Sequence, residues 1–113
     1  GGALALGVGD HIAILEYGTY SVASPEACAS IVWRESDKAP EAAEAMKVGA
    51  NDLKKIGIVD EIITEPVGGA HQDYDTISAS IKLSLLTNIG ELSKLSQEEL
   101  LQRRYQRLLK IGA

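Results

Sequence analysis

Aromatic residues are scarce in this sequence. Phe is absent, Trp occurs once, and aromatic residues make up 4% of the chain, whereas 45% of its residues are hydrophobic. Any core must therefore consist mainly of Ala, Ile, Leu and Val, and the aromatic platforms on which nucleic-acid bases stack are lacking. The net charge of -5 argues in the same direction, because affinity for a phosphate backbone comes from clustered Lys and Arg. We expect no nucleic-acid partner.

Cysteine and long apolar runs are also scarce. Cys28 is the single cysteine, so it can form neither an internal disulfide nor a cysteine-based metal site, which favours a reducing compartment. Its alanine-rich surroundings indicate a buried helix rather than a reactive thiol. No run approaches the roughly 20 apolar residues of a membrane span, and no signal peptide is recognisable. We expect a cytoplasmic protein without a membrane partner.

With 113 residues the chain is long enough for one domain with a core, but not for two. It opens on Gly1-Gly2 instead of Met, which predicts a piece of a longer protein. Its charge is uneven, because residues 91–113 carry 5 basic and 3 acidic side chains, whereas residues 1–90 carry 6 and 13. The basic run Arg103–Arg107 is therefore either a solvated helix surface or a patch that contacts an anion or a partner, and partner contact is favoured because the positive tail follows an acidic body.

Local patterns divide the chain into short elements. Small apolar residues over 2–8 predict a helix, and β-branched runs over 11–15 and 19–23 predict two strands, joined as a hairpin or placed in successive layers. A third strand is expected over 58–63 and a loop over 65–71. Further helices are expected over 24–33, 40–48 and 51–57, then over most of the remaining chain, with a capping box at Ser96 and Glu99 that starts the last one.

Side chains that could perform catalysis are few. The sequence has no HExxH or GxSxG motif and no spacing typical of metal ligands, so we expect no metal in this chain. The best candidate is the backbone of Gly1-Gly2, because glycines at a helix start let a substrate approach the N–H groups that face a developing anion. The alternative is that this glycine pair only allows close helix packing.

Two other side chains, His71 and Arg34, are candidates for substrate binding. His71 follows two glycines on a predicted loop, where functional residues are common, although a histidine there also caps or packs. Arg34 follows a predicted helix end and could hold a carboxylate, although a basic residue is also favoured there by the helix dipole. His11 lies at the edge of a predicted strand and is interpreted as structural.

Several segments together resemble the carboxyltransferase alpha subunit of bacterial-type or plastid-type acetyl-CoA carboxylase, over its C-terminal part. They run along the whole chain and comprise Gly1–Ala5, Gly7–Asp10, Tyr20–Ala29, Lys38–Pro40, Ala42–Met46, Glu65-Pro66, Gly68–His71 and Arg103–Leu108. The resemblance implies an α/β fold of the crotonase type (the ClpP/crotonase superfamily), of which this chain is the C-terminal half. Residues 1–70 would form half of the core, and residues 71–113 a helical tail.

The resemblance also implies a function. Members of this family transfer a carboxyl group from carboxybiotin, held by the biotin carboxyl carrier protein, to acetyl-CoA, and malonyl-CoA for fatty-acid synthesis results. Gly1 and Gly2 align with the glycine pair whose N–H groups stabilise the biotin oxyanion, and Ala3, His71 and Arg34 are candidates for substrate contact. The implied partners are a zinc-containing beta subunit in an α2β2 complex, the carrier protein and biotin carboxylase, in the bacterial cytoplasm or the plastid stroma.

Two other functions stay open at this point. The segment could be a non-catalytic assembly module, in which the glycine pair only packs and the basic tail binds a partner. It could also belong to another acyl-CoA enzyme of the crotonase superfamily, although such enzymes need acidic residues upstream of this segment. As part of a carboxyltransferase alpha subunit, the segment alone is expected to be inactive, because half of the implied active site comes from the beta subunit.

Overall fold

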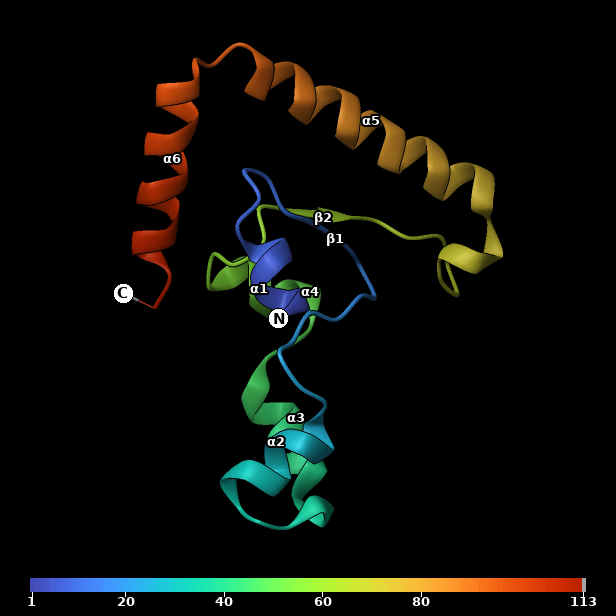
Figure 1. Cartoon of the computed structure of the whole chain (residues 1–113). Helices are drawn as coiled ribbons and strands as arrows, with labels where there is room; N and C mark the ends of the chain where they lie inside the picture. The colour runs from blue at the N-terminus through green and yellow to red at the C-terminus, as the bar shows by residue number, and fades with distance from the viewer. Residues whose placement is uncertain (113) are drawn as a thin grey trace.

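The computed structural model describes residues 1–112 as short helices around a two-stranded sheet (Figure 1). In chain order the elements are α1 (Gly2–Gly7), β1 (Ala13–Leu15), α2 (Pro25–Val32), η1 (Ser36–Lys38), α3 (Ala39–Met46), α4 (Ala50–Lys55), β2 (Glu61–Ile63), η2 (Ala70–Gln72), α5 (Tyr74–Ser93) and α6 (Gln97–Lys110). This mixture of helices with a small parallel sheet is compatible with the expected α/β class. The expected division at residue 70 stays a prediction.

The sheet pairs strands that are far apart in sequence. β1 and β2 run parallel, with Ala13 opposite Glu61 and Leu15 opposite Ile63. Parallel strands need a long crossover connection. Here α2, α3 and α4 lie within it, and Figure 1 shows α2 and α3 projecting as a pair away from the sheet. The sheet contains two of the three strands that the sequence patterns predicted.

The predicted second strand over 19–23 is wrong, and so is the hairpin. Only Thr19 forms a bridge, with Gly49, and the Tyr20 N–H donates to the carbonyl oxygen of Val48 at 3.1 Å. The Ser21 hydroxyl then donates to the carbonyl of Ala23 at 2.9 Å, which favours a turn over an extended ladder. Residues 20–23 line an apolar cavity instead of joining the sheet.

Helix starts follow the local signals. The Ser24 Oγ accepts from the Ala27 N–H at 3.1 Å with Pro25 in the first turn, so this predicted cap is confirmed. The capping box at the start of α6 is also confirmed, because Ser96 and Glu99 bind each other's backbone N–H groups at 3.1 and 3.3 Å.

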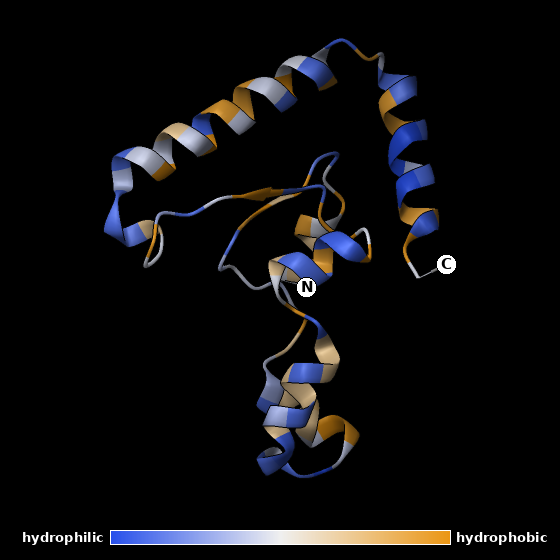
Figure 2. Cartoon of the chain, turned by 180° about the vertical axis from the view of Figure 1, so that it is seen from behind, coloured by the Kyte–Doolittle hydropathy of each residue, from blue (hydrophilic) through white to orange (hydrophobic). Residues whose placement is uncertain are grey.

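The core is small and is made largely of short side chains. The buried hydrophobic residues are Ala29, Ala42, Ala50, Leu53, Val59 and Ile77. Ala29 of α2 and Ala42 of α3 are both 0% exposed, which lets these two helices approach closely. Cys28 is half-buried on α2. In Figure 2, hydrophobic residues are spread along α5, whereas α6 is mainly hydrophilic.

The described chain is more open than a typical globular domain of its length. Its radius of gyration is 16.4 Å, whereas a compact domain of this length has about 13 Å. Its accessible surface is 7984 Å², against about 6,000 Å² for a folded monomer of this mass. Large apolar side chains such as Leu83 and Leu86 are 68% and 63% exposed. Among residues 1–112, no helix is both long and apolar enough to cross a membrane.

Candidate functional site

The glycine pair lies where helix α1 begins. Gly1 is the N-cap and Gly2 the first helical residue, and no side chain among the described residues caps this end. The Gly1 carbonyl accepts from the Ala5 N–H at 3.0 Å, whereas the first N–H groups of a helix have no partner within it. A Cβ atom placed on Gly1 or Gly2 would meet no described atom within 4 Å. The N–H groups are therefore open to an incoming oxyanion.

Tyr20 connects α1 to the rest of the chain. Its hydroxyl donates to the carbonyl oxygen of Ala3, one residue beyond the glycine pair. Gly7 lies on the same side of α1, and a Cβ atom there would be 3.0 Å from the Tyr20 hydroxyl. A larger residue at position 7 would push the tyrosine away, so Gly7 allows Tyr20 to reach α1.

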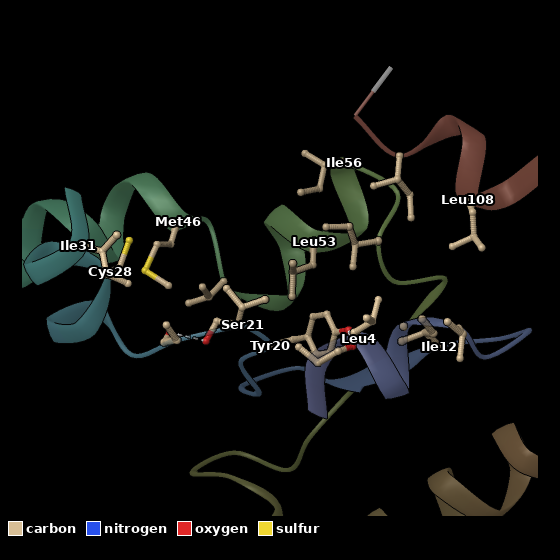
Figure 3. A pocket seen from close by; sticks show the side chains of 18 residues that line it. Leu4, Ile12, Tyr20, Ser21, Cys28, Ile31, Met46, Leu53, Ile56 and Leu108 are labelled. Atoms are coloured by element: carbon tan, nitrogen blue, oxygen red, sulfur yellow. Dashed lines mark hydrogen bonds between the residues drawn. The ribbon is translucent and has the colours of Figure 1, made fainter. Parts of the chain in front are cut away.

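An apolar cavity of about 530 Å³ opens beside α1 (Figure 3). Ala3 and Leu4 contribute one wall, and α4 and the end of α6 contribute others through Leu53 and Leu108. Cys28 and Met46 reach it from the α2–α3 pair. Ala3, the predicted contact residue that follows the glycine pair in sequence, thus lines this cavity, whereas Gly1 and Gly2 are not among its lining residues.

Arg34 and His71 lie on other parts of the chain. Arg34 follows α2 with a positive φ of 60°, and its side chain is exposed. His71 is exposed on η2, where its Nε2 is 3.1 Å from the Nε2 of Gln72. Neither residue is among those that line the cavity beside Ala3. Their roles in substrate binding stay predictions.

The expected basic tail of α6 makes contacts within the chain. Arg104 binds both carboxylate oxygens of Asp10, with its Nε at 2.9 Å and its Nη2 at 2.7 Å. This hydrogen bonding by Arg104 lowers the pKa of Asp10 below its ordinary value. Arg107 donates from Nη1 to the Gly9 carbonyl at 3.0 Å and from Nη2 to the Ile58 carbonyl at 2.9 Å. These two arginines therefore bind the chain's own turns.

A second polar cluster, which the sequence did not reveal, holds α5 against β2. The Oε1 atom of Glu61 lies 2.9 Å from the His11 Nε2 and accepts from the Ser84 Oγ at 2.7 Å. The Asn88 Nδ2 donates to the same oxygen at 3.1 Å. The Ser84 hydroxyl, followed by His11, lowers the pKa of Glu61. His11 has the structural role that was expected of it.

Glu65 organises the predicted loop before His71. Its carboxylate accepts from the Tyr17 N–H at 2.6 Å and from the Ala70 N–H at 2.8 Å. Gly68 and Gly69 have φ values of 90° and 110°, a region that favours glycine over other residues. The predicted loop is confirmed up to η2. Within residues 1–112, no three His, Cys, Asp or Glu side chains gather as a metal site would require.

Comparison with known proteins decides the family. A family model described as acetyl co-enzyme A carboxylase carboxyltransferase-like matches residues 1–112. The chain belongs to this family.

Relatives within this carboxyltransferase family share more than half of their aligned residues with the chain. It is 59% identical over 112 residues to the acetyl-coenzyme A carboxylase carboxyl transferase subunit alpha of Photobacterium profundum. The subunits of the same name from Photorhabdus laumondii and Vibrio cholerae are 57% and 56% identical over 112 residues. Each match covers 99% of this chain and 35% of the relative. The chain thus spans about a third of the length of these relatives.

Proposed function

We propose that this chain forms the biotin side of a carboxyltransferase site, in which a carboxyl group passes from carboxybiotin to acetyl-CoA to give malonyl-CoA. The observation that carries the proposal is the open glycine pair at the start of α1, in a chain whose relatives are named carboxyl transferase subunits. We further infer that the whole protein has a crotonase-type fold, to which the parallel pair β1–β2 would belong.

The chemistry expected of this chain is electrostatic. Bound carboxybiotin supplies the carboxyl group and, once it has released that group, a base for the acetyl proton. The N–H groups of Gly1 and Gly2 would donate to the ureido oxygen as negative charge develops there, helped by the positive end of the α1 dipole. Removing one donor of this kind costs roughly 2.7–4 kcal/mol of transition-state stabilisation. No side chain of this segment is required as an acid or base.

The exposed surface indicates contacts beyond this segment. The accessible surface of 7984 Å² exceeds that of a compact monomer by about 2,000 Å², more than the roughly 800 Å² that one partner buries in a standard interface, and both the rest of the subunit and partner chains would cover it. The proposed partners are a zinc-containing beta subunit, which would supply the second oxyanion site in an α2β2 complex, the biotin carboxyl carrier protein and biotin carboxylase. The proposed location is the bacterial cytoplasm or the plastid stroma.

The same exposed surface would also suit a non-catalytic assembly module, so the test must separate the two functions. Residues 1–112 would replace the matching segment of the Photobacterium profundum subunit, and the chimera would be purified together with its beta subunit. Malonyl-CoA-dependent carboxylation of free biotin, the reverse reaction, would then be measured. We expect the chimera to react at a rate similar to that of the unmodified subunit, and residues 1–112 alone to be inactive. A chimera that assembles without turnover would favour the assembly module.

A further inference from the structure

Helix α1 has little of its own to hold it in place. It contains six residues, and none of them is buried by the described part of the chain. Isolated helices shorter than about 12–15 residues are marginal in water. The position of the glycine pair must therefore depend on the groups that contact the two ends of α1. Near its start this group is the Tyr20 hydroxyl, which binds the Ala3 carbonyl.

At its other end, α1 leads directly into a turn to which two arginines of α6 donate hydrogen bonds. Val8 is the C-cap of α1, and Gly9 and Asp10 follow it. Arg104 holds the Asp10 carboxylate with two hydrogen bonds, a fork geometry that fixes direction as well as distance. Arg107 holds the Gly9 carbonyl at 3.0 Å. The partners in these pairs are 94 and 98 residues apart in sequence.

Arg107 also connects this turn to the segment before β2. Its second terminal nitrogen donates to the Ile58 carbonyl at 2.9 Å and lies 3.3 Å from the Asp60 carboxylate. The Arg107 side chain is only 13% exposed, and its Nε is buried without a partner among residues 1–112. Burying a guanidinium this deeply is costly unless its other groups are paired, so Arg107 is built into the structure rather than free at the surface.

We propose that Arg104 and Arg107 of α6 are positioning residues that hold α1, and with it the oxyanion donors of Gly1-Gly2, in register for carboxyl transfer. The role in catalysis rests on the proposed function, whereas the mechanical link between α6 and α1 rests on the contacts alone. None of the α6 residues, all of which are described, is buried, and besides the wall that Leu108 adds to the apolar cavity, the arginines attach this helix by directed hydrogen bonds. A displacement of about 1 Å at a reacting centre can cost about 10²-fold in rate.

Hydrogen exchange tests the mechanical link without any activity. The Ala5 N–H, which bonds to Gly1 within α1, reports on that helix, and the Glu16 N–H, which bonds to Ile63 at 2.9 Å, reports on the sheet. In Arg104→Met and Arg107→Met we expect the Ala5 amide to exchange about tenfold faster or more, as the loss of charge-assisted hydrogen bonds implies. The Glu16 amide should keep its rate. Arg103→Met is the matched control, because Arg103 is an exposed neighbour that carries the same charge.

Kinetics of the chimera then test the positioning role. We expect Arg104→Met and Arg107→Met to lower kcat about tenfold or more, with KM and assembly unchanged and Arg103→Met like the parent. Arg104→Lys keeps the charge but loses the two-pronged hydrogen bonding of the guanidinium, so its kcat should lie between those of the parent and Arg104→Met. An unchanged Ala5 exchange rate would overturn the link, and faster exchange with normal kcat would overturn the positioning role. If Gly2 variants show that the oxyanion role itself is wrong, the exchange result still decides whether α6 holds α1.

Discussion

Replacing Glu61 with alanine should release α5 from the sheet. The Glu61 Oε1 is the common partner of His11, Ser84 and Asn88, and Ser84 is the one buried polar residue of α5, whose residues are all described. Taking about 1 kcal/mol for each of the three hydrogen bonds, the free energy of unfolding should fall by about 3 kcal/mol. Urea denaturation followed by circular dichroism measures this loss. The control is Glu44→Ala, the same change at an exposed position of α3.

The pH dependence of the difference in unfolding free energy between the parent and Glu61→Ala tests whether the ionised Glu61 carboxylate causes it. The pKa of Glu61 is lowered from its ordinary 4.5 in the folded chain, so the unfolded chain takes up the proton first as the pH falls. The stabilisation is therefore complete above about pH 4.5 and is lost as the pH falls through the lower, folded-state pKa. We expect the difference in unfolding free energy between the parent and Glu61→Ala to decrease as the pH falls below about 4.5. A gap that stays constant well below pH 4.5, or equal stabilities for Glu61→Ala and Glu44→Ala, would refute this reasoning.

Three substitutions test local backbone structure by urea denaturation. Gly90→Ala should raise the unfolding free energy by about 0.5–1 kcal/mol, because Gly90 is within α5 and an added Cβ would meet open space. Gly57→Ala should instead lower the unfolding free energy by about 1 kcal/mol, because Gly57 has a φ of 84°, in the left-handed region, although its surroundings are equally open. A more stable Gly57→Ala would contradict this backbone conformation. Ser96→Ala should cost about 1 kcal/mol by removing the cap of α6, and an unchanged midpoint would show that this helix start does not need it.

Features encoded by neighbouring residues could be predicted from the sequence. The Ser24-Pro25 pair and the Ser96–Glu99 box mark helix starts because their hydrogen bonds span only three residues. The first helix was predicted from its run of small apolar residues, and α1 begins at Gly2 without a side-chain cap. Hydrophobic patterning alone cannot distinguish a strand from an irregular segment whose apolar residues line a cavity. This explains why the strand predicted over 19–23 is wrong.

Contacts between distant residues could not be predicted. Nothing near Asp10 indicates that its partner is Arg104, and nothing near Glu61 indicates that Ser84 and Asn88 point toward it. The arginines of α6 looked like a surface patch because a basic run has the same appearance whether it meets solvent, a partner or the chain's own carboxylates. The glycine pair was found from residue type and family resemblance, whereas its dependence on α6 and Tyr20 emerges only from the fold.

The most direct test of the proposed function compares Gly2→Pro with Gly2→Ala in the chimera assembled with its beta subunit. Gly2 is the first residue of α1, a position that tolerates proline, so this change removes one N–H donor without breaking the helix. Alanine keeps the N–H, and its Cβ would meet no described atom within 4 Å. In malonyl-CoA-dependent carboxylation of biotin, we expect kcat of Gly2→Pro to fall about 10²–10³-fold and Gly2→Ala to stay much closer to the parent. Full activity of an assembled Gly2→Pro complex would contradict the oxyanion role and leave Gly1-Gly2 as a packing element.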